Sequence, residues 1–200
     1  MSDMANNDAI EAIGQRAKAA ANSDRPLTAV LLLEQLREQT TLTSPQNYLL
    51  ADSLRLVGRQ REALVLFEQL ERANVPNEKR WYMPFGIGMI YLSIGEIAKA
   101  EAAFRKAAEL EPTSTVPWVY LGTTISKSER FDDAIAAFRC GLKAQGDLDE
   151  VYLNLGLSLR TVGQFEEARE AFRSALALDP DYDAAKAALA DVESAIAIKK

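Results

Sequence analysis

The feature that most constrains this fold is a sequence pattern that recurs with a period of about 34 residues. The segment AIAAFRCGL (134–142) is followed one period later by AREAFRSAL (168–176), and AEAAFRKAA begins one period before it at Ala100. Earlier copies begin at Ala63 and Ala29. Self-similarity at a fixed period indicates stacked copies of one supersecondary unit, each of which buries its apolar face against its neighbours.

Each copy reads as two helices with a turn between them. In the last copy, Tyr152, Leu155 and Leu159 recur at helical spacing, which places their side chains on one face of a helix. Gly163 follows as a residue that readily takes a positive φ and ends a helix. Pro180 stops the second helix, because proline disfavours helix at the residue before it. The pattern therefore predicts an all-α solenoid of helix-turn-helix hairpins.

The copies account for nearly the whole chain of 200 residues, which we expect to form one domain. Three extra residues, about Glu78 to Arg80, precede the third copy. Residues 183–198 are expected to form a capping helix that shields the apolar face of the last copy, and with Met1 they suggest a complete protein. The five repeats are placed at about 10–43, 44–77, 81–114, 115–148 and 149–182.

The pattern resembles the tetratricopeptide repeat family, whose unit is a helical hairpin of about 34 residues with fixed small and large positions. The small residue of the first helix is Ala17, Ala51, Gly88, Gly122 and Gly156, the alanine of the second helix is Ala29, Ala63, Ala100, Ala134 and Ala168, and the large apolar residue four positions later is Leu33, Phe67, Phe104, Phe138 and Phe172. The match covers roughly residues 10 to 182, but Arg16 stands where the family places leucine. The resemblance implies a right-handed superhelix that binds peptides or protein segments.

Composition excludes several classes of function. The net charge of −6 argues against nucleic acid, which calls for clustered Lys and Arg, and against an anionic membrane surface. The longest apolar run, residues 29–33, is far too short to span a bilayer, and the N-terminus shows no signal peptide. The single cysteine, Cys140, excludes an internal disulfide and fits a reducing compartment. We therefore expect a cytoplasmic protein with no membrane insertion.

Chemistry-bearing motifs are weak in this sequence. The chain has no histidine, which removes Ser/His and Cys/His nucleophile pairs and the commonest transition-metal ligand. The GIG at 86–88 has no third glycine in place for a nucleotide loop, and the DPDYD at 179–183 lacks the glycine and distal glutamate of a calcium loop. Cys140 is expected to be a small buried hydrophobe. We predict a protein without enzymatic activity, cofactor or metal.

The resemblance implies that the first helices of successive hairpins line a concave groove. In that family, a stripe of residues turned about 100° from the core stripe points into the groove. Applying this register gives the predicted groove residues Tyr48, Leu49, Asp52, Arg55, Tyr82, Phe85, Met89, Val119, Tyr120, Thr123, Leu153, Asn154, Leu157 and Arg160. The middle of this set is apolar and aromatic, with charge toward its ends. The groove is therefore predicted to bind a helix or an extended peptide with apolar anchors.

The sequence leaves alternatives open for both the groove and the function. Some family members grip a C-terminal carboxylate with Lys, Arg and Asn, but Phe85, Val119 and Leu153 stand at those positions and disfavour such a clamp. The chain also bears a weak resemblance to the chaperones of bacterial type III secretion. Some of these residues could pack against a neighbouring hairpin, or residues 1–9 could fill the groove. The main hypothesis is an adaptor or chaperone for an apolar protein segment. The alternatives are a homo-oligomeric scaffold such as a homodimer, and an enzyme or regulatory module cut from a longer chain.

Overall fold

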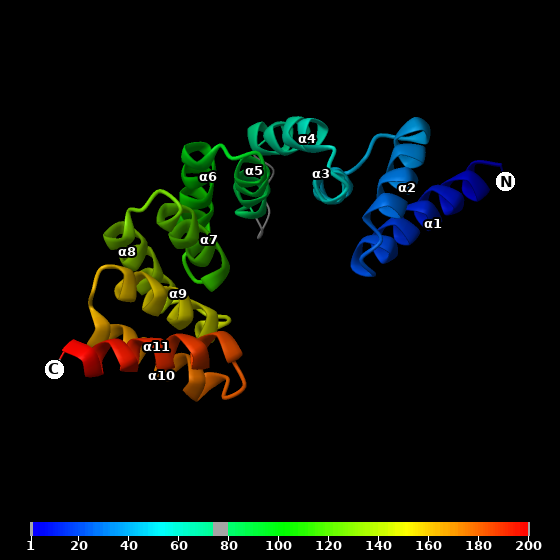
Figure 1. Ribbon diagram of the computed structural model, residues 1–200. Coiled ribbons are helices and arrows are strands. Elements are labelled where there is room, and N and C mark those ends of the chain that lie inside the picture. Colours follow the sequence, from blue (N-terminus) through cyan, green and yellow to red (C-terminus); the bar gives the residue numbers. More distant parts are fainter. Residues whose placement is uncertain (1, 74–79, 200) are drawn as a thin grey trace. The chain divides into compact units, whose positions relative to one another are not determined.

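The computed structural model describes residues 2–73 and 80–199, with side chains from residue 8 onward, and is all-helical within them (Figure 1). The helices are α1 Ser2–Asn22, α2 Pro26–Gln39, α3 Ser44–Leu56, α4 Gln60–Arg72, α5 Tyr82–Ser93, α6 Ile97–Leu110, α7 Thr115–Ser126, α8 Phe131–Gly141, α9 Leu148–Thr161, α10 Phe165–Leu178 and α11 Asp183–Lys199. Strand-like pairing among the described residues is confined to a single bridge between Ser114 and Gln145. The all-α prediction is confirmed.

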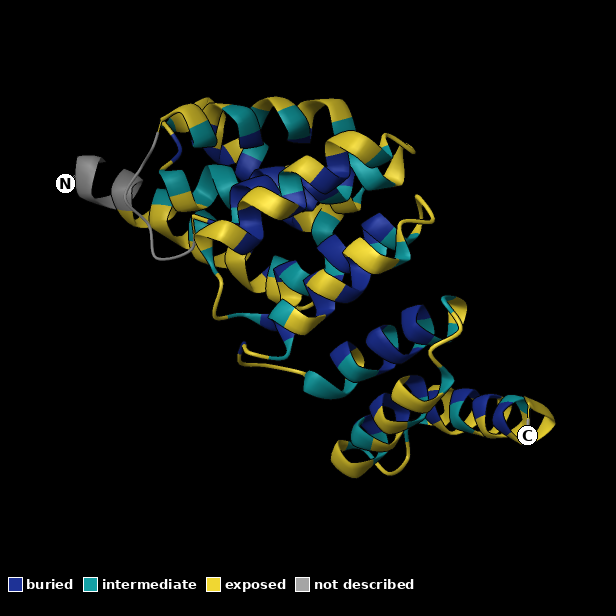
Figure 2. Ribbon diagram, turned by 90° about the vertical axis from the view of Figure 1, so that its left-hand side faces the viewer, coloured by how far each residue is buried: buried dark blue, intermediate teal, exposed yellow. Residues whose placement is uncertain are grey.

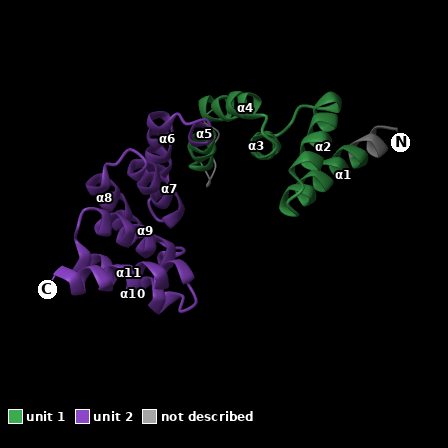
Figure 3. Ribbon diagram, viewed as in Figure 1, with its two compact units in different colours: residues 1–90 green, residues 91–200 purple. Residues whose placement is uncertain are grey.

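The chain divides into two compact units (Figure 3). Unit 1 comprises residues 1–90 and unit 2 comprises residues 91–200, so the boundary falls inside α5. In unit 1, α1 packs against α2 and α3 against α4, and α2 packs against α3. Unit 2 repeats this arrangement with α7 and α8, then α9 and α10. The predicted organisation as one domain stays a prediction.

The helix bounds follow the repeat pattern. Each predicted copy contains one pair of helices, and α11 packs on α10 and α9, as the predicted capping helix should. Residues 2–9 belong to the first helix. Of the three extra residues, Glu78 and Lys79 lie outside the described part of the chain, and Arg80 is exposed. Pro84 is the third residue of α5, within the first turn, where a missing backbone N–H removes no helical hydrogen bond.

Buried residues alternate with exposed ones along the helices (Figure 2), and the core includes the positions that the repeat fixes. The alanine position of the second helix is fully buried in all five hairpins, and so are the leucine or phenylalanine side chains four residues later. In the first hairpin, Ala17 and Leu33 are both 0% exposed while Arg16 is exposed. The first hairpin therefore follows the common register, and Arg16 is accommodated at its surface.

Close helix crossings explain the glycines of the first helices. A Cβ added at Gly122 would lie 2.5 Å from the ring of Phe138, and one added at Gly156 would lie 2.5 Å from the ring of Phe172. These separations are shorter than any van der Waals contact, so a larger side chain would push the two helices of a hairpin apart. Glycine at the crossing and phenylalanine on the facing helix form one packing unit.

Candidate functional site

The first helices lie beside one another within each unit, as the predicted groove requires. In unit 1, α1 contacts α3, and in unit 2, α7 contacts α9, which contacts α11. Each predicted groove residue belongs to one of α3, α5, α7 and α9. The two units are considered separately below.

Aromatic side chains gather on α3 and α5 in unit 1. The ring of Tyr48 meets Phe67 edge-on at a centroid distance of 5.8 Å and Tyr82 at 5.7 Å. Trp81 stacks on Tyr82 at 4.0 Å and meets Phe85 edge-on at 5.5 Å. These geometries are the ones that aromatic pairs prefer. The predicted residues Tyr48, Tyr82 and Phe85 are therefore half-buried and held by one another, and the predicted Met89 is also half-buried on α5.

Burial changes the chemistry of Tyr48. Burial raises the pKa of its phenol above the usual value, and the negative charge of Asp52 raises this pKa further. The phenol is therefore a neutral hydroxyl across the physiological pH range, able to donate and accept a hydrogen bond. Asp52 itself is held by Arg55, whose Nη2 and Nε lie 2.7 Å and 3.0 Å from Asp52 Oδ1. The charge predicted at this end of the groove is thus an internal ion pair.

A hollow of about 270 Å³ lies between α1 and α3 in unit 1, and we call it the concave hollow. Two predicted groove residues, Tyr48 and Leu49, line it. Gln46 Oε1 accepts a hydrogen bond of 2.9 Å from the backbone N–H of Thr43, which fixes the start of α3 and turns the amide Nε2 toward Gly14. The complete lining is Glu11, Gly14, Gln15, Lys18, Pro45, Gln46, Tyr48 and Leu49.

Four residues of α1 in this hollow were missed by sequence reasoning. The presence of Arg16 left the register of the first hairpin in doubt, so no groove residue was assigned to it. The signal was nevertheless present in the repeat. Counting back one repeat length from Tyr48, Leu49 and Asp52 gives Gly14, Gln15 and Lys18, all of which line the concave hollow.

Two predicted groove residues of unit 2 are corrected by the structure. Val119 and Leu153 are only 6% and 8% exposed, so they belong to the core of this unit and offer little surface. The repeat register misjudged their exposure because α7 and α9 pack directly against each other. Tight stacking of first helices hides part of the stripe that a single helix would present.

The other predicted residues of unit 2 are half-buried and largely engaged. Tyr120 lies 5.4 Å from the ring of Phe104. Asn154 Nδ2 donates to the backbone carbonyl of Glu150 at 2.9 Å, and Arg160 Nη1 lies 2.7 Å from Asp191 Oδ2 on α11. Arg160 therefore ties the terminal helix to α9. Thr123 and Leu157 complete the set.

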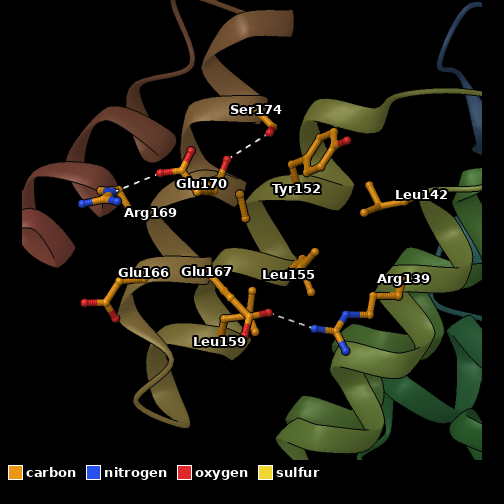
Figure 4. Close-up of a pocket in the computed structure, with 11 residues that line it drawn as sticks. Arg139, Leu142, Tyr152, Leu155, Leu159, Glu166, Glu167, Arg169, Glu170 and Ser174 are labelled. Carbon is orange, nitrogen blue, oxygen red and sulfur yellow. Dashed lines mark hydrogen bonds and ion pairs between the residues drawn. The ribbon is translucent and has the colours of Figure 1, made fainter.

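The second-helix side of the hairpins carries further hollows. In unit 2, one of about 440 Å³ lies over α8, α9 and α10, where Arg139 Nη2 lies 3.0 Å from Glu167 Oε2 across an apolar floor (Figure 4). Another, of about 310 Å³, lies over α6, α7 and α8 and includes Cys140, which is half-buried, not buried as predicted. Ion pairs between consecutive hairpins recur on this side. Exposed pairs of this kind contribute little to stability.

Metal and membrane chemistry have little support in the described residues. Within residues 2–73 and 80–199, no three acidic or cysteine side chains are grouped so as to hold a metal ion. None of the helices described there has both the length and the hydropathy needed to cross a bilayer.

Stacked hairpins with small residues at their crossings define a helical repeat protein. A family model described as the cilia and flagella-associated protein 70 C-terminal domain, a tetratricopeptide repeat model, matches residues 6–198. The chain belongs to this tetratricopeptide repeat family.

Solved structures share the fold at low sequence identity. YrrB, described as a TPR protein with an unusual peptide-binding site, is 19% identical with a TM-score of 0.68, over 92% of this chain and 97% of that chain. MamA from Desulfovibrio magneticus RS-1 is 14% identical with a TM-score of 0.72, over 87% and 97%. MamA AMB-1 is 23% identical with a TM-score of 0.67, over 88% and 94%. No curated protein matches the chain significantly in sequence.

Proposed function

We propose that the protein is a non-enzymatic interaction module, an adaptor or chaperone, that holds an apolar helix or peptide against its first helices. The observation that carries this proposal is the concave hollow, where Tyr48 and Leu49 of α3 face the polar side chains of α1. Its volume of about 270 Å³ suits one or two apolar side chains of a ligand. Neutral Tyr48 and the amides of Gln15 and Gln46 supply hydrogen bonds for a ligand backbone.

The aromatic cluster of Tyr48, Trp81, Tyr82 and Phe85 supports the same proposal. Trp81 is buried and the other three rings are half-buried, and half-buried rings fixed by neighbours offer contact area at a low cost in conformational entropy. The peptide-binding site named for YrrB is a property of that protein, and the shared fold makes a peptide ligand a reasonable expectation here. A cytoplasmic location belongs to the proposal as well.

A negative charge introduced in the concave hollow or in the aromatic cluster tests the proposal. Partners captured from native lysate by the wild-type chain should be lost by Leu49→Glu and Phe85→Glu, because a carboxylate would be desolvated against the ligand. Leu178→Glu is the matched control, since Leu178 is 54% exposed on α10, away from the first-helix face. Circular dichroism must show all three variants folded. Unchanged capture by folded Leu49→Glu and Phe85→Glu variants would refute the groove.

Self-association is the second candidate, and exposed leucines on α2 favour it. Leu27 and Leu31, one helical turn apart, are 61% and 59% exposed. Apolar neighbours exposed to this degree often mark a protein contact. Light scattering on the full chain over a range of concentrations separates the candidates, because a monomer at every concentration would remove this one.

A further inference from the structure

A third hollow, on the second-helix side of unit 1, differs in chemistry from the two described in unit 2. We call it the back hollow, and its volume is about 360 Å³. Its floor includes Leu50 and Leu54 of α3, which are 0% and 2% exposed. One wall is Val65 of α4, which is 52% exposed, beside Leu66. The floor is therefore closed off from solvent, and the apolar surface that the hollow offers comes from its wall of Val65 and the half-buried Leu66.

Both carboxylates that line the back hollow, Glu34 and Glu62, are held by one arginine. Arg59 lies at the start of α4 and holds Glu62 with two hydrogen bonds of 2.7 Å, while its Nη1 lies 2.8 Å from Glu34 Oε1 of α2. These hydrogen bonds from Arg59 lower the pKa of Glu62, with a smaller contribution from the charge of Arg37. One guanidinium thus engages both acidic side chains that line the hollow.

The two arginines that line the back hollow make no close contact with a carboxylate of the described residues. Arg37 of α2 and Arg61 of α4 both line it, both are exposed, and neither makes an ion pair or a hydrogen bond with any residue that the structure describes. Arg37 lies on α2 and Arg61 on α4, and the apolar floor formed by α3 lies between these two helices. A ligand lying over the floor would therefore meet a positive charge on each side.

In the equivalent hollows of unit 2, the arginines of the lining are paired. In the hollow over α9, Arg139 pairs with Glu167 and Arg169 pairs with Glu170 (Figure 4). In the hollow over α7, Arg105 and Arg130 both pair with Glu101. Every arginine that lines these two hollows has a carboxylate partner. Among these three hollows, the back hollow of unit 1 is therefore the one whose lining arginines lack a carboxylate partner within the described residues.

The net charges of the two units also favour unit 1 as the place where an acidic segment binds. Residues 1–90 contain 10 Lys and Arg against 11 Asp and Glu, a net charge of −1, whereas residues 91–200 contain 13 against 18, a net charge of −5. An acidic segment is repelled less by the first part of the chain than by the second, because like charges disfavour association.

We propose that the back hollow is a second interaction surface, separate from the concave hollow, and that it binds an acidic amphipathic helix of a partner protein. Apolar side chains of that helix rest on Val65 and Leu66, and its carboxylates pair with Arg37 and Arg61. A planar guanidinium forms bidentate hydrogen bonds with a carboxylate, which suits this arrangement. The exposed apolar wall favours such a helix over a nucleic acid, whose non-specific binding relies on phosphate contacts.

Synthetic peptides test this surface on the full chain. The probes are two labelled peptides of about 18 residues with leucine at helical i, i+4 and i+7 spacing, one filled with Glu and the other with Lys. In fluorescence anisotropy, the Glu peptide should bind and the Lys peptide should not. The double variant Arg37→Glu/Arg61→Glu should weaken binding of the Glu peptide by about tenfold or more, and added salt should weaken binding to the wild type.

Two controls decide the outcome. Lys18→Glu places a reversed charge in the concave hollow and should leave binding of the Glu peptide unchanged. Val65→Ser, with both arginines intact, should weaken binding if the apolar wall takes part. The proposal is overturned if Lys18→Glu has the larger effect, if Val65→Ser has none, or if single-stranded DNA or polyglutamate binds as well as the Glu peptide.

Discussion

The turn between the two helices of each hairpin requires the left-handed backbone region at one residue. Glycine supplies it at Gly58, Gly95 and Gly163, with φ between 80° and 82°. The same position is Asp24 in the first hairpin, with φ of 52°, and Glu129 in the fourth, with φ of 58°. A side chain in this region costs about 1–2 kcal/mol. The fourth hairpin therefore carries backbone strain that its neighbours avoid.

Glu129→Gly should stabilise the protein. Relief of strain at positive φ exceeds the added entropy of glycine in the unfolded chain, so we expect a gain of about 0.5–1 kcal/mol. Thermal denaturation should show a rise of about 2 °C. The reverse change, Gly163→Ala, should lower stability by about 1 kcal/mol. A neutral result for both changes would show that the turns adapt freely.

Gly156→Ala tests the packing unit of glycine and phenylalanine. Alanine favours a helix by about 1 kcal/mol, but the new Cβ would overlap the ring of Phe172, and overpacking costs about 1–3 kcal/mol. Net destabilisation is expected in urea denaturation. Phe172→Leu in the same chain should reduce the cost of Gly156→Ala, because residues in contact are not additive. Strict additivity of the two changes would contradict the contact.

At the scale of single elements, the start of α9 concentrates negative charge. Burial raises the pKa of Glu150, and the charges of Asp147 and Asp149 raise it further. A carboxyl whose pKa is higher in the folded state binds its proton more readily there. Its ionised form therefore destabilises the fold above the unfolded pKa, and the penalty disappears as the pH falls below that value.

Glu150→Gln removes this penalty. The variant should melt at a higher temperature than the wild type at pH 7, and the difference should disappear near pH 4. Asp181→Asn is a suitable control, because Asp181 is a fully exposed carboxylate in the loop before α11. A wild type more stable than Glu150→Gln at pH 7 would mean that the carboxylate is favoured where it lies.

Most of the fold could be predicted because its determinants are local and repeated. The small position, the alanine and the large apolar position identify both helices of a hairpin, and five copies reinforce one another. The exposure of a predicted groove residue depends on the distance between the first helices of successive hairpins. The sequence does not give that distance. Val119 and Leu153 were assigned to the surface for this reason, although both are buried.

The same limit applies to charge. A sequence lists arginines but does not say which are paired, so Arg37 and Arg61 were indistinguishable from Arg59. Arg59 differs from them because its side chain reaches from the start of α4 to Glu34 of α2 and pairs with it. Lys18 and Gln15 were missed for a different reason, since a single departure at Arg16 obscured a register that the rest of the hairpin keeps.

At the scale of the whole molecule, the two units differ in the hollows and in the charged side chains that each contains. Unit 1 carries the concave hollow, the aromatic cluster and the back hollow with unpaired arginines. Unit 2 carries paired charges and a terminal helix, which Arg160 and Arg173 tie to the array through Asp191 and Glu193. We therefore propose that unit 1 carries most of the partner binding and that unit 2 provides a capped end.

Site-specific photo-crosslinking tests the central claim most directly. A photoreactive amino acid at Gln15 lies at the edge of the concave hollow, and the same group at Gln164 lies on an exposed turn of unit 2. In native lysate, the account predicts that Gln15 captures a discrete partner, that Gln164 does not, and that Leu49→Glu abolishes the capture. Equal capture of that partner from both positions, or capture at Gln15 that survives Leu49→Glu in a folded chain, would contradict it.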